Sequence, residues 1–412
     1  RKIERLCPTE LSIGSAIVMM RRNVLLGVAS IVALASPAAA FNAPALSPCS
    51  FAATRTAACN VAAKARLPSF GRKSMPLAAP RQAAAGPSMK GYSIDLTGKV
   101  AFIAGVADAS GYGWAIAKQL ANAGATIVVG TWPPVLTLFE RGIKKGFGED
   151  GQLLDGTAMV IDKIYPLDAM FSNPSEVPDD IKANKRYAGI TGYDIESCAA
   201  KVKADYGKVD ILIHSLANGP EVTRPLLDTS RAGYLAASSA SAYSAVSMLG
   251  HFGPMMPKGS SFLSLSYLAS EMVVPGYGGG MSSAKAQLES DTKVLSWEAG
   301  RKYGIRVNTI SAGPLASRAA IAIKKGAAGE RNYIDYCIDY NIANSPLAKP
   351  LYADDVGRAA LGLCSDIGGA VTGTCAYVDN GMHCMGLTVD SNSFKEYIDQ
   401  QSGEPWDNWK AD

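Results

Sequence analysis

Two tyrosines and a lysine follow an apolar run in the second half of the chain. Tyr267 comes directly after the run Phe262 to Ser266, Tyr277 lies ten residues further on, and Lys285 eight residues after that. A phenol can donate a hydrogen bond to an oxygen on which negative charge develops, and a nearby ammonium can orient a ligand and stabilise that charge. We therefore interpret Tyr277 and Lys285 as a catalytic pair. The alternative for Tyr277 is a core or interface tyrosine.

A glycine-rich turn follows an earlier apolar run. The run Val100 to Ala104 leads into Gly105, and Gly111 and Gly113 precede a stretch with helical spacing. Such a turn lets backbone N–H groups and the helix N-terminus approach a pyrophosphate. Three glycines after a strand are a weak signal alone, because ordinary strand-to-helix turns also use glycine. Within an alternating α/β pattern they predict a dinucleotide site.

The next apolar run lacks the acidic residue that usually holds the adenosine ribose at its end. The chain has Gly130, Thr131, Trp132 and Pro133 there. Trp132 can lay its ring on adenine, or it can simply pack the loop. No Arg or Lys is adjacent in the sequence to bind a 2′-phosphate, so we expect a preference for NADH over NADPH.

The elements that must position these residues are short apolar runs that alternate with helical patterns. The runs are Val100 to Ala104, Thr126 to Gly130, Val209 to His214, Phe262 to Ser266, Ile305 to Ile310 and Cys375 to Val378. Buried strands separated by amphipathic stretches predict an α/β fold with a Rossmann-like, doubly wound parallel sheet in one domain. Prolines and glycines from Trp132 to Asn184 interrupt the alternation, so we expect a long excursion there that serves the site.

Charge is divided unevenly along the chain. Residues 1–90 hold 12 basic and 2 acidic side chains, whereas residues 91–412 hold 28 basic and 34 acidic ones. The part expected to fold is therefore net negative and has no general attraction for phosphate backbones, which argues against nucleic acid as a partner. His214, His251 and His383 have no spacing typical of metal ligands, so we expect no metal site.

The first 90 residues have the composition of targeting sequence. An Arg pair precedes the apolar run Val24 to Ala35 and a small-residue stretch that ends at Ala40, which is the pattern of a signal peptide and is too short to span a membrane. Residues 41–90 begin with Phe41, lack acids and are rich in Ala, Ser, Pro and Arg, as transit peptides are. We expect upstream residues and a signal peptide in 1–40 and a plastid transit peptide in 41–90. This leader resembles the two-part leaders of plastid proteins in algae with secondary plastids and implies the plastid (chloroplast) stroma. The alternative is secretion, but the odd number of five cysteines after residue 90 argues against it.

The spacing of the catalytic candidates resembles one family of short-chain dehydrogenases. The ordinary Tyr-x3-Lys spacing is absent, because Met281 stands four residues after Tyr277 and Lys285 stands eight after it, with Tyr267 ten before. These features look like the enoyl-acyl-carrier-protein reductase family in its plant and apicomplexan form. Further strings agree: Gly105 to Trp114, Tyr165 to Ala169, His214 to Pro220, Ser311 to Leu315 and Val378 to Gly381. The resemblance spans roughly 93–390; we expect the reductase domain in 91–390 and a tail of undefined role in 391–412.

The resemblance implies NADH-dependent reduction of the trans-2 double bond of an enoyl chain on acyl carrier protein. In this family Tyr277 would donate to the enolate oxygen, Lys285 would hold the nicotinamide ribose, and Tyr267 would stand where a ketoreductase has Ser. Tyr267 could also pack against the acyl chain. Residues implied as cofactor contacts are Gly105, Tyr112 and Gly113 at the pyrophosphate; Trp132, Asp168 and Ala169 at adenine; Ser215, Leu216, Ala217 and Asn218 beside the cofactor; and Ala312, Gly313, Pro314, Leu315 and Ser317 at the carboxamide.

A mobile substrate lid is expected at 317–331, where an apolar stretch ends in glycines. Its cations, Arg318, Lys324, Lys325 and Arg331, form a patch suited to an acidic carrier protein, or else an ordinary solvated helix end. The family resemblance also implies a homotetramer. Two alternatives stay open: an NADPH-dependent 3-oxoacyl reductase of the same superfamily, and a nucleotide-sensing protein without catalysis.

Overall fold

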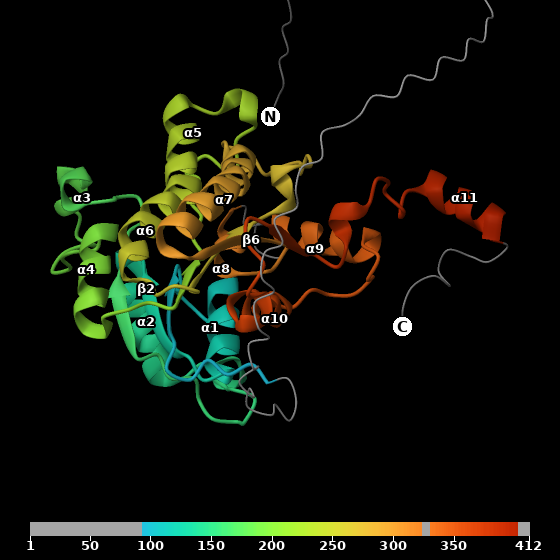
Figure 1. Ribbon diagram of the computed structural model, residues 1–412. Coiled ribbons are helices and arrows are strands. Elements are labelled where there is room, and N and C mark those ends of the chain that lie inside the picture. The colour runs from blue at the N-terminus through green and yellow to red at the C-terminus, as the bar shows by residue number, and fades with distance from the viewer. Residues whose placement is uncertain (1–92, 324–329, 403–412) are drawn as a thin grey trace, which may run out of the picture. The chain divides into compact units, whose positions relative to one another are not determined.

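The computed structural model describes residues 93–323 and 330–402, which build a seven-stranded sheet with helices on both faces (Figure 1). The strand order is β3-β2-β1-β4-β5-β6-β7, and every neighbouring pair is parallel. The strands are β1 Val100–Ala104, β2 Thr126–Thr131, β3 Lys163–Pro166, β4 Ile211–His214, β5 Ser261–Ser266, β6 Arg306–Ala312 and β7 Cys375–Val378. The order reverses beside β1, as in a doubly wound fold, so the predicted fold class is confirmed.

Eleven helices are assigned within the described residues. They are α1 Tyr112–Asn122, α2 Pro133–Lys145, α3 Asp179–Lys182, α4 Ile195–Tyr206, α5 Arg231–Ser238, α6 Ser244–Phe252, α7 Met281–Tyr303, α8 Arg318–Ile323, α9 Tyr333–Asn344, α10 Ala353–Cys364 and α11 Asn392–Ser402. A π-helical turn, Ser239–Tyr243, joins α5 to α6. Helices α1 and α10 pack side by side over one face of the sheet (Figure 1), and α4, α6 and α7 cover the other.

The core forms because the central strands are apolar on both sides. In β1 every residue is buried: Ala101 and Ile103 face the cluster under α1, while Phe102 faces the opposite cluster and packs on Phe252 of α6 at 4.8 Å between ring centroids. Burial of one large apolar side chain of this kind contributes about 1.5–3 kcal/mol. A parallel sheet covered on both faces needs such continuous apolar runs, which is why these strands were recognisable in the sequence.

Helix α7 carries the candidate lysine along the sheet. Its 23 residues lie between Gly280 (φ 81°) and Gly304 (φ 73°), both in the left-handed region that glycine adopts most easily. Ala284, Leu288 and Ala299 bury one face of the helix. Lys285 lies between the first two of these and is therefore turned toward the sheet as well.

One strand was missed in the sequence, and the region around it was described wrongly. The expected excursion at 132–184 contains α2, the edge strand β3 and α3 rather than loop alone. Strand β3, Lys-Ile-Tyr-Pro, has two apolar side chains and pairs with β2 alone, so it shows no continuous apolar run. The six predicted strands are all present, with ends shifted by one or two residues at most.

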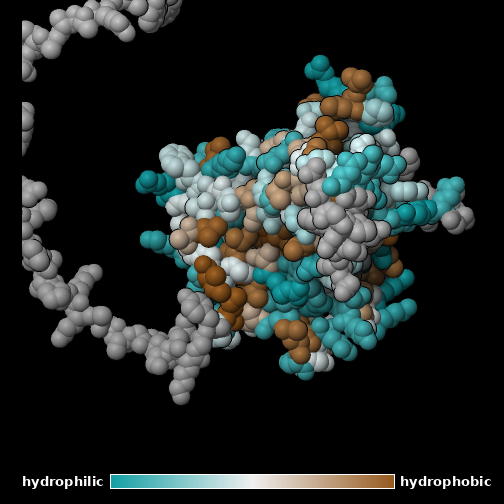
Figure 2. Space-filling model, turned by 90° about the vertical axis from the view of Figure 1, so that its right-hand side faces the viewer, coloured by the Kyte–Doolittle hydropathy of each residue, from teal (hydrophilic) through white to brown (hydrophobic). Residues whose placement is uncertain are grey.

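The predicted leader, 1–90, lies outside the described residues. In the tail, α11 extends away from the sheet at the right of Figure 1. The face on that side shows apolar side chains in separate groups between polar ones (Figure 2). Within 93–323 and 330–402 no helix has the length and apolarity needed to cross a bilayer.

Candidate active site

Four predicted segments meet at one edge of the sheet. Gly105 follows β1, Ser215 follows β4, Tyr267 follows β5 and Gly313 follows β6, and these strands are neighbours in the order β1-β4-β5-β6. In parallel sheets ligands bind outside the carboxyl ends of the strands, where the strand order reverses. That switch point lies between β1 and β4 in this sheet, so the fold gathers the candidate residues where a dinucleotide would bind.

The glycines of the first turn have distinct structural roles. Gly105 has φ 98°, and a Cβ there would lie 2.0 Å from the Ser215 carbonyl oxygen. A Cβ on Gly113 would lie 3.1 Å from the Ser215 Oγ. Gly111, in contrast, has open space around it and caps α1 without a side-chain hydrogen bond. The open helix N-terminus beside Gly111 therefore fits a pyrophosphate, while Gly105 and Gly113 bring the β1 and β4 turns together.

Tyr112 connects two of these turns. Its hydroxyl donates to the Gly313 carbonyl oxygen at 2.6 Å, and burial raises the pKa of this phenol. The side chain is thus already bound to backbone at the carboxamide segment. Any contact of Tyr112 with a pyrophosphate would come from its backbone at the start of α1.

Trp132 and Asp168 lie together, although they follow different strands. The Trp132 Nε1 donates to Asp168 Oδ2 at 3.1 Å and also lies 3.1 Å from the Tyr187 hydroxyl, which itself donates to Asp168 at 2.6 Å. The indole remains 44% exposed, whereas Asp168 is buried. Asp168 follows β3, so a buried acid from the neighbouring strand lies against the tryptophan that follows β2.

A cation also lies at this end of the site. The Arg186 guanidinium stands over the Trp132 ring at 5.5 Å from its centroid. Arg186 and Tyr187 were not identified in the sequence, because nothing in their spacing relates them to β2. No Arg or Lys is adjacent to Trp132 in the sequence, but the fold brings Arg186 onto its ring.

The segment after β4 is held by a serine of the π-helical turn. Ser215 N donates to the Ala104 carbonyl, which fixes the start of the segment on β1. Further on, Asn218 N donates to Ser241 Oγ at 3.0 Å, and Ser241 Oγ donates to the Asn218 carbonyl at 3.1 Å. Leu216 of this segment packs against the core cluster, and Met281 lies against Gly219. Ser241 was missed in the sequence, since an isolated serine in a helical stretch carries no signal of its own.

Tyr277 lies in the turn before α7 rather than on the helix. The first two glycines that follow it pack against backbone: a Cβ on Gly278 would lie 1.9 Å from the Arg224 carbonyl oxygen, and one on Gly279 (φ 60°) would lie 2.2 Å from the Glu221 carbonyl oxygen. Gly278 N donates to Val222 O at 2.9 Å and Gly279 N to Arg224 O at 3.0 Å. The structure shows a fixed turn closed by the 222–224 backbone.

The two tyrosines are in contact. Their rings meet edge to face, with centroids 5.2 Å apart and an angle of 74° between planes. Burial raises the pKa of both Tyr267 and Tyr277. Both phenols are therefore protonated near neutral pH and can act as hydrogen-bond donors.

Lys285 is buried beside the end of β5. Its Nζ donates to the Leu265 carbonyl at 2.9 Å, two residues before Tyr267 in the chain. Burial lowers the pKa of this ammonium to about 8, against an opposing effect of Glu289. Both members of the predicted pair therefore lie close to Tyr267. Tyr277 contacts its ring, and Lys285 binds the Leu265 carbonyl two residues before it.

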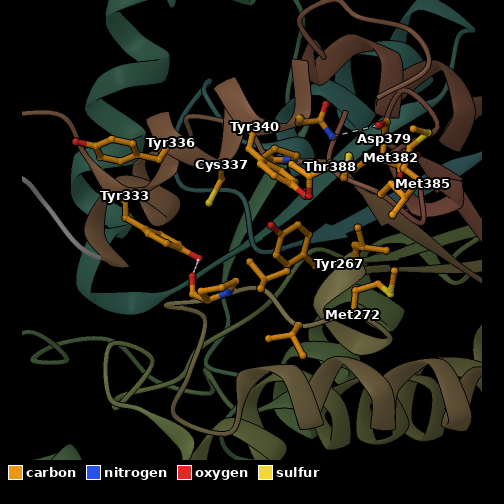
Figure 3. A pocket seen from close by; sticks show the side chains of 18 of the residues that line it. Tyr267, Met272, Tyr333, Tyr336, Cys337, Tyr340, Asp379, Met382, Met385 and Thr388 are labelled. Atoms are coloured by element: carbon orange, nitrogen blue, oxygen red, sulfur yellow. Dashed lines mark hydrogen bonds between the residues drawn. The ribbon is translucent and has the colours of Figure 1, made fainter. Parts of the chain in front are cut away.

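A cavity of about 700 Å³ opens at Tyr267. In Figure 3 the Tyr267 ring lies near its centre, with side chains of α9 on one side and methionines on the other. Gly313 and Pro314 of the predicted carboxamide segment also line it. The rest of the wall was not predicted: Leu268, Met272 to Pro275, Tyr333, Tyr336, Cys337, Tyr340, Asn341, Asp379, Met382, Met385, Gly386, Leu387 and Thr388. Most of these side chains are apolar or aromatic, and they suit a long acyl chain better than a small polar substrate.

The start of the expected lid is tied to the glycine turn. Ser317, after Leu315, accepts from Ala320 N at the beginning of α8. Arg318 pairs with Asp108 at 3.3 Å, and its N–H donates to Ser110 Oγ. Arg331 pairs with Asp339. Two of the four cations of the expected patch, Arg318 and Arg331, are therefore already paired with carboxylates. The other two, Lys324 and Lys325, lie outside the described residues.

His214 is an inert part of the strand end. Its Nε2 lies 2.8 Å from Ser244 Oγ, and Nδ1 has no hydrogen-bond partner in the part of the chain that the structure describes. Burial lowers the pKa of His214 to about 3, so the ring is neutral. Among residues 93–323 and 330–402 no cluster of His, Cys, Asp and Glu could hold a metal ion.

Known proteins match both the sequence and the fold. A family model described as Enoyl-(Acyl carrier protein) reductase matches residues 192–383. A chloroplastic enoyl-[acyl-carrier-protein] reductase [NADH] 1 of Oryza sativa is 59% identical over 303 residues, which is 73% of this chain and 79% of the relative. The chain belongs to the enoyl-acyl-carrier-protein reductase family.

Solved structures of the family agree with the fold. The enoyl-acyl-carrier-protein reductase of Plasmodium berghei with triclosan superposes with a TM-score of 0.67 at 49% identity, covering 71% of this chain and all of the other. The enoyl-acyl-carrier-protein reductase of Anaplasma phagocytophilum in complex with NAD gives a TM-score of 0.57 at 28% identity, covering 73% and 98%. The family resemblance found in the sequence is confirmed.

Proposed function

We propose that this protein reduces the trans-2 double bond of an enoyl chain carried by acyl carrier protein, with NADH as reductant, in fatty-acid synthesis. The observation that carries the proposal is the meeting of Tyr277 and the β5 end that holds Lys285 beside Tyr267, which lines an apolar cavity. The family membership and the NADH enzymes among the relatives support it.

The residues at the sheet edge fit a dinucleotide. The open space beside Gly111 and the uncapped start of α1 suit the pyrophosphate, and half-exposed Trp132 suits adenine. The buried Asp168 carboxylate next to Trp132 would repel a 2′-phosphate. Arg186 acts in the opposite sense, but its guanidinium is engaged over the indole ring. The balance favours NADH, and a higher kcat/KM with NADPH would contradict it.

The chain's own residues account for the rest of the chemistry. Bound NADH would supply the hydride added at C3 of the enoyl thioester. Negative charge then develops on the thioester oxygen, and the protonated Tyr277 phenol is the donor we assign to it; a proton from solvent taken up at C2 completes the saturated acyl thioester. Lys285 supplies a fixed positive charge and, when NADH is bound, holds the ribose. Tyr267 positions the thioester end of the chain, and the apolar cavity excludes water from it.

Reduction of a carbonyl by the same fold is the alternative. The two activities separate in one assay, in which the purified protein is given NADH or NADPH with crotonyl thioester or with acetoacetyl thioester. We expect NADH to be consumed with the crotonyl substrate. Faster turnover of the 3-oxoacyl thioester with NADPH would establish the alternative, and no turnover with either would support a nucleotide-sensing role.

The carrier protein would dock beside the lid. Arg318 and Arg331 are paired within the chain, so we assign the main attraction to Lys324 and Lys325. Reversal of both lysine charges should raise KM for crotonyl-carrier-protein several-fold, more at low salt, and leave crotonyl-CoA nearly unaffected. Equal losses on both substrates would mean that the lysines act on the lid itself.

We also propose a homotetramer. Val294 and Trp297, one turn apart on α7, are 54% and 66% exposed, and Tyr243 of the π-helical turn is 53% exposed. Large apolar side chains gathered on a helix surface are typical of subunit contacts. Light scattering should give four times the chain mass, and Trp297→Glu should lower it; an unchanged mass would place the interface elsewhere.

We assign the protein to the plastid, because the rice relative is chloroplastic by name. A signal peptide in 1–40, a transit peptide in 41–90, the reductase domain in 91–390 and a separate tail in 391–412 remain the proposed organisation. N-terminal sequencing of the protein from its native compartment would locate the mature start. A start well before residue 80 or after residue 100 would contradict the proposed boundary.

A further inference from the structure

A buried carboxylate lies one turn beyond the catalytic lysine. Glu289 follows Lys285 by four residues on α7, so the two side chains emerge from the same face of the helix. Glu289 is 9% exposed and Lys285 5%. Acids and lysines are rarely buried to this degree without a partner of opposite charge.

Both side chains are tied to consecutive residues at the end of β5. The Lys285 Nζ donates to the Leu265 carbonyl, and the Ser266 hydroxyl donates to the Glu289 carboxylate. The next residue in the chain is Tyr267, which lines the cavity. The strand end and the helix are therefore connected by two hydrogen bonds, one through the cation and one through the anion.

We propose that Glu289 is a positioning residue for catalysis: its buried carboxylate, held by Ser266, keeps the Lys285 ammonium charged where the cofactor binds. The role in catalysis rests on the proposed function. The electrostatic effect of Glu289 on Lys285 does not depend on it. Without a nearby anion, a lysine in this setting would lose its proton near neutral pH and with it the charge that stabilises the reaction.

Other ionisable groups around the pair do not titrate in the same range. On β4, burial lowers the pKa of His214 to about 3. On β7, Cys375 has its pKa raised to about 12, and the pKa of Tyr377 is raised as well, in both cases by burial first and then by acids that include Glu289. The pKa values of Tyr267 and Tyr277 are also raised.

Two further charges stand nearby: Glu271 accepts a hydrogen bond from Tyr377, and exposed Lys293 follows Glu289 on α7. Lys285 is thus the group expected to change charge near pH 8.

The test follows NADH binding with pH in the purified protein, by cofactor fluorescence. In the wild type, affinity should fall as pH rises past about 8, where Lys285 loses its proton. In Glu289→Gln the same fall should begin about one pH unit lower, which makes binding roughly fivefold weaker near pH 8 and about tenfold weaker well above it. Glu289→Asp keeps the charge and should restore the wild-type profile. Glu298→Gln, an exposed acid on the same helix, is the matched control and should change nothing.

Unfolding of the cofactor-free protein gives a second readout. Either Lys285→Met or Glu289→Gln leaves one buried charge without its partner, so the double variant should lose less stability than the two single losses together. If Glu289→Gln does not fold, the double variant should fold.

Several results would overturn the proposal. Glu289 would have only a packing role if NADH affinity of Glu289→Gln fell at the same pH as in the wild type, or were lower by the same factor at every pH. Additive losses of unfolding free energy in the double variant would lead to the same conclusion. A double variant that fails to fold would do the same. If the wild type binds NADH but reduces no enoyl thioester, the proposed function fails, while the binding profile and the unfolding cycle still decide the role of Glu289.

Discussion

The two sides of the active site are built in opposite ways. On the cofactor side, the end of β5 and α7 hold Lys285, Glu289 and Ser266 in a buried polar network with named hydrogen-bond partners. On the acyl side, α9 and residues 382–388 form an apolar cavity wall of tyrosines, methionines and a cysteine. A polar network loses function when one member is removed, whereas an apolar wall tolerates change in shape. The proposed site would therefore combine a fixed polar network with an adaptable apolar surface for the chain.

Among the substitutions that test this contrast, the largest effect is expected from one at Tyr277. Tyr277→Phe removes the donor to the enolate oxygen and should cost on the order of 3 kcal/mol in the barrier, about a hundredfold in kcat, with NADH affinity little changed. Steady-state kinetics with crotonyl thioester measures the first, and fluorescence titration the second. Near-full activity of Tyr277→Phe together with an inactive Tyr267→Phe would reverse the assignment of the donor.

A second break targets the fixed turn that carries Tyr277. Gly278→Ala places a Cβ 1.9 Å from the Arg224 carbonyl oxygen, so it should destabilise the fold by about 3 kcal/mol. Gly250→Ala is the matched control: it lies within α6 with nothing in reach of the new Cβ, and should stabilise by about 0.5–1 kcal/mol. Urea unfolding compares them. Equal stability of the two variants would mean that the turn yields easily and is not fixed.

The acyl side should respond to volume rather than to polarity. Met385→Trp fills part of the cavity and should lower kcat/KM about tenfold for a long enoyl chain, while crotonyl thioester is turned over nearly as before. Met385→Leu, which keeps the volume, should leave both substrates almost unchanged. The comparison uses a short and a long enoyl thioester under identical conditions. A loss that is independent of chain length would mean that this wall does not bind the chain.

The smallest effect is expected at Tyr112, which connects the start of α1 to the segment after β6. Tyr112→Phe removes the hydrogen bond to the Gly313 carbonyl and should cost about 1 kcal/mol of stability, with a modest rise in KM for NADH. Thermal unfolding and steady-state kinetics measure these changes. A large loss of NADH binding would instead show that the hydroxyl itself contacts the cofactor.

The parts of the fold that the sequence could reveal are those dictated by local pattern. The apolar runs of β1, β4 and β5 are buried on both faces and stand out, while β3 is a half-exposed edge strand and was missed. The excursion after Trp132 was misjudged for the same reason, since its helices are short or strongly exposed on one side.

The site divides in the same way. Tyr277 and Lys285 could be proposed from the sequence because their spacing is itself a motif. Ser241, Arg186 and Glu289 could not, because each contacts a partner that only the fold brings near: Asn218, Trp132 and Ser266. The α9 wall of the cavity likewise consists of ordinary helix residues whose role depends on meeting the 382–388 segment.

The most direct test of the account follows the transferred hydrogen. The purified protein is given crotonyl-carrier-protein with NADH that carries deuterium at both C4 positions, and the product is analysed by mass spectrometry and NMR. The account predicts a butyryl product with one deuterium at C3, formed by the wild type and about a hundredfold more slowly by Tyr277→Phe. Absence of deuterium from C3, or equal rates in the two proteins, would contradict it.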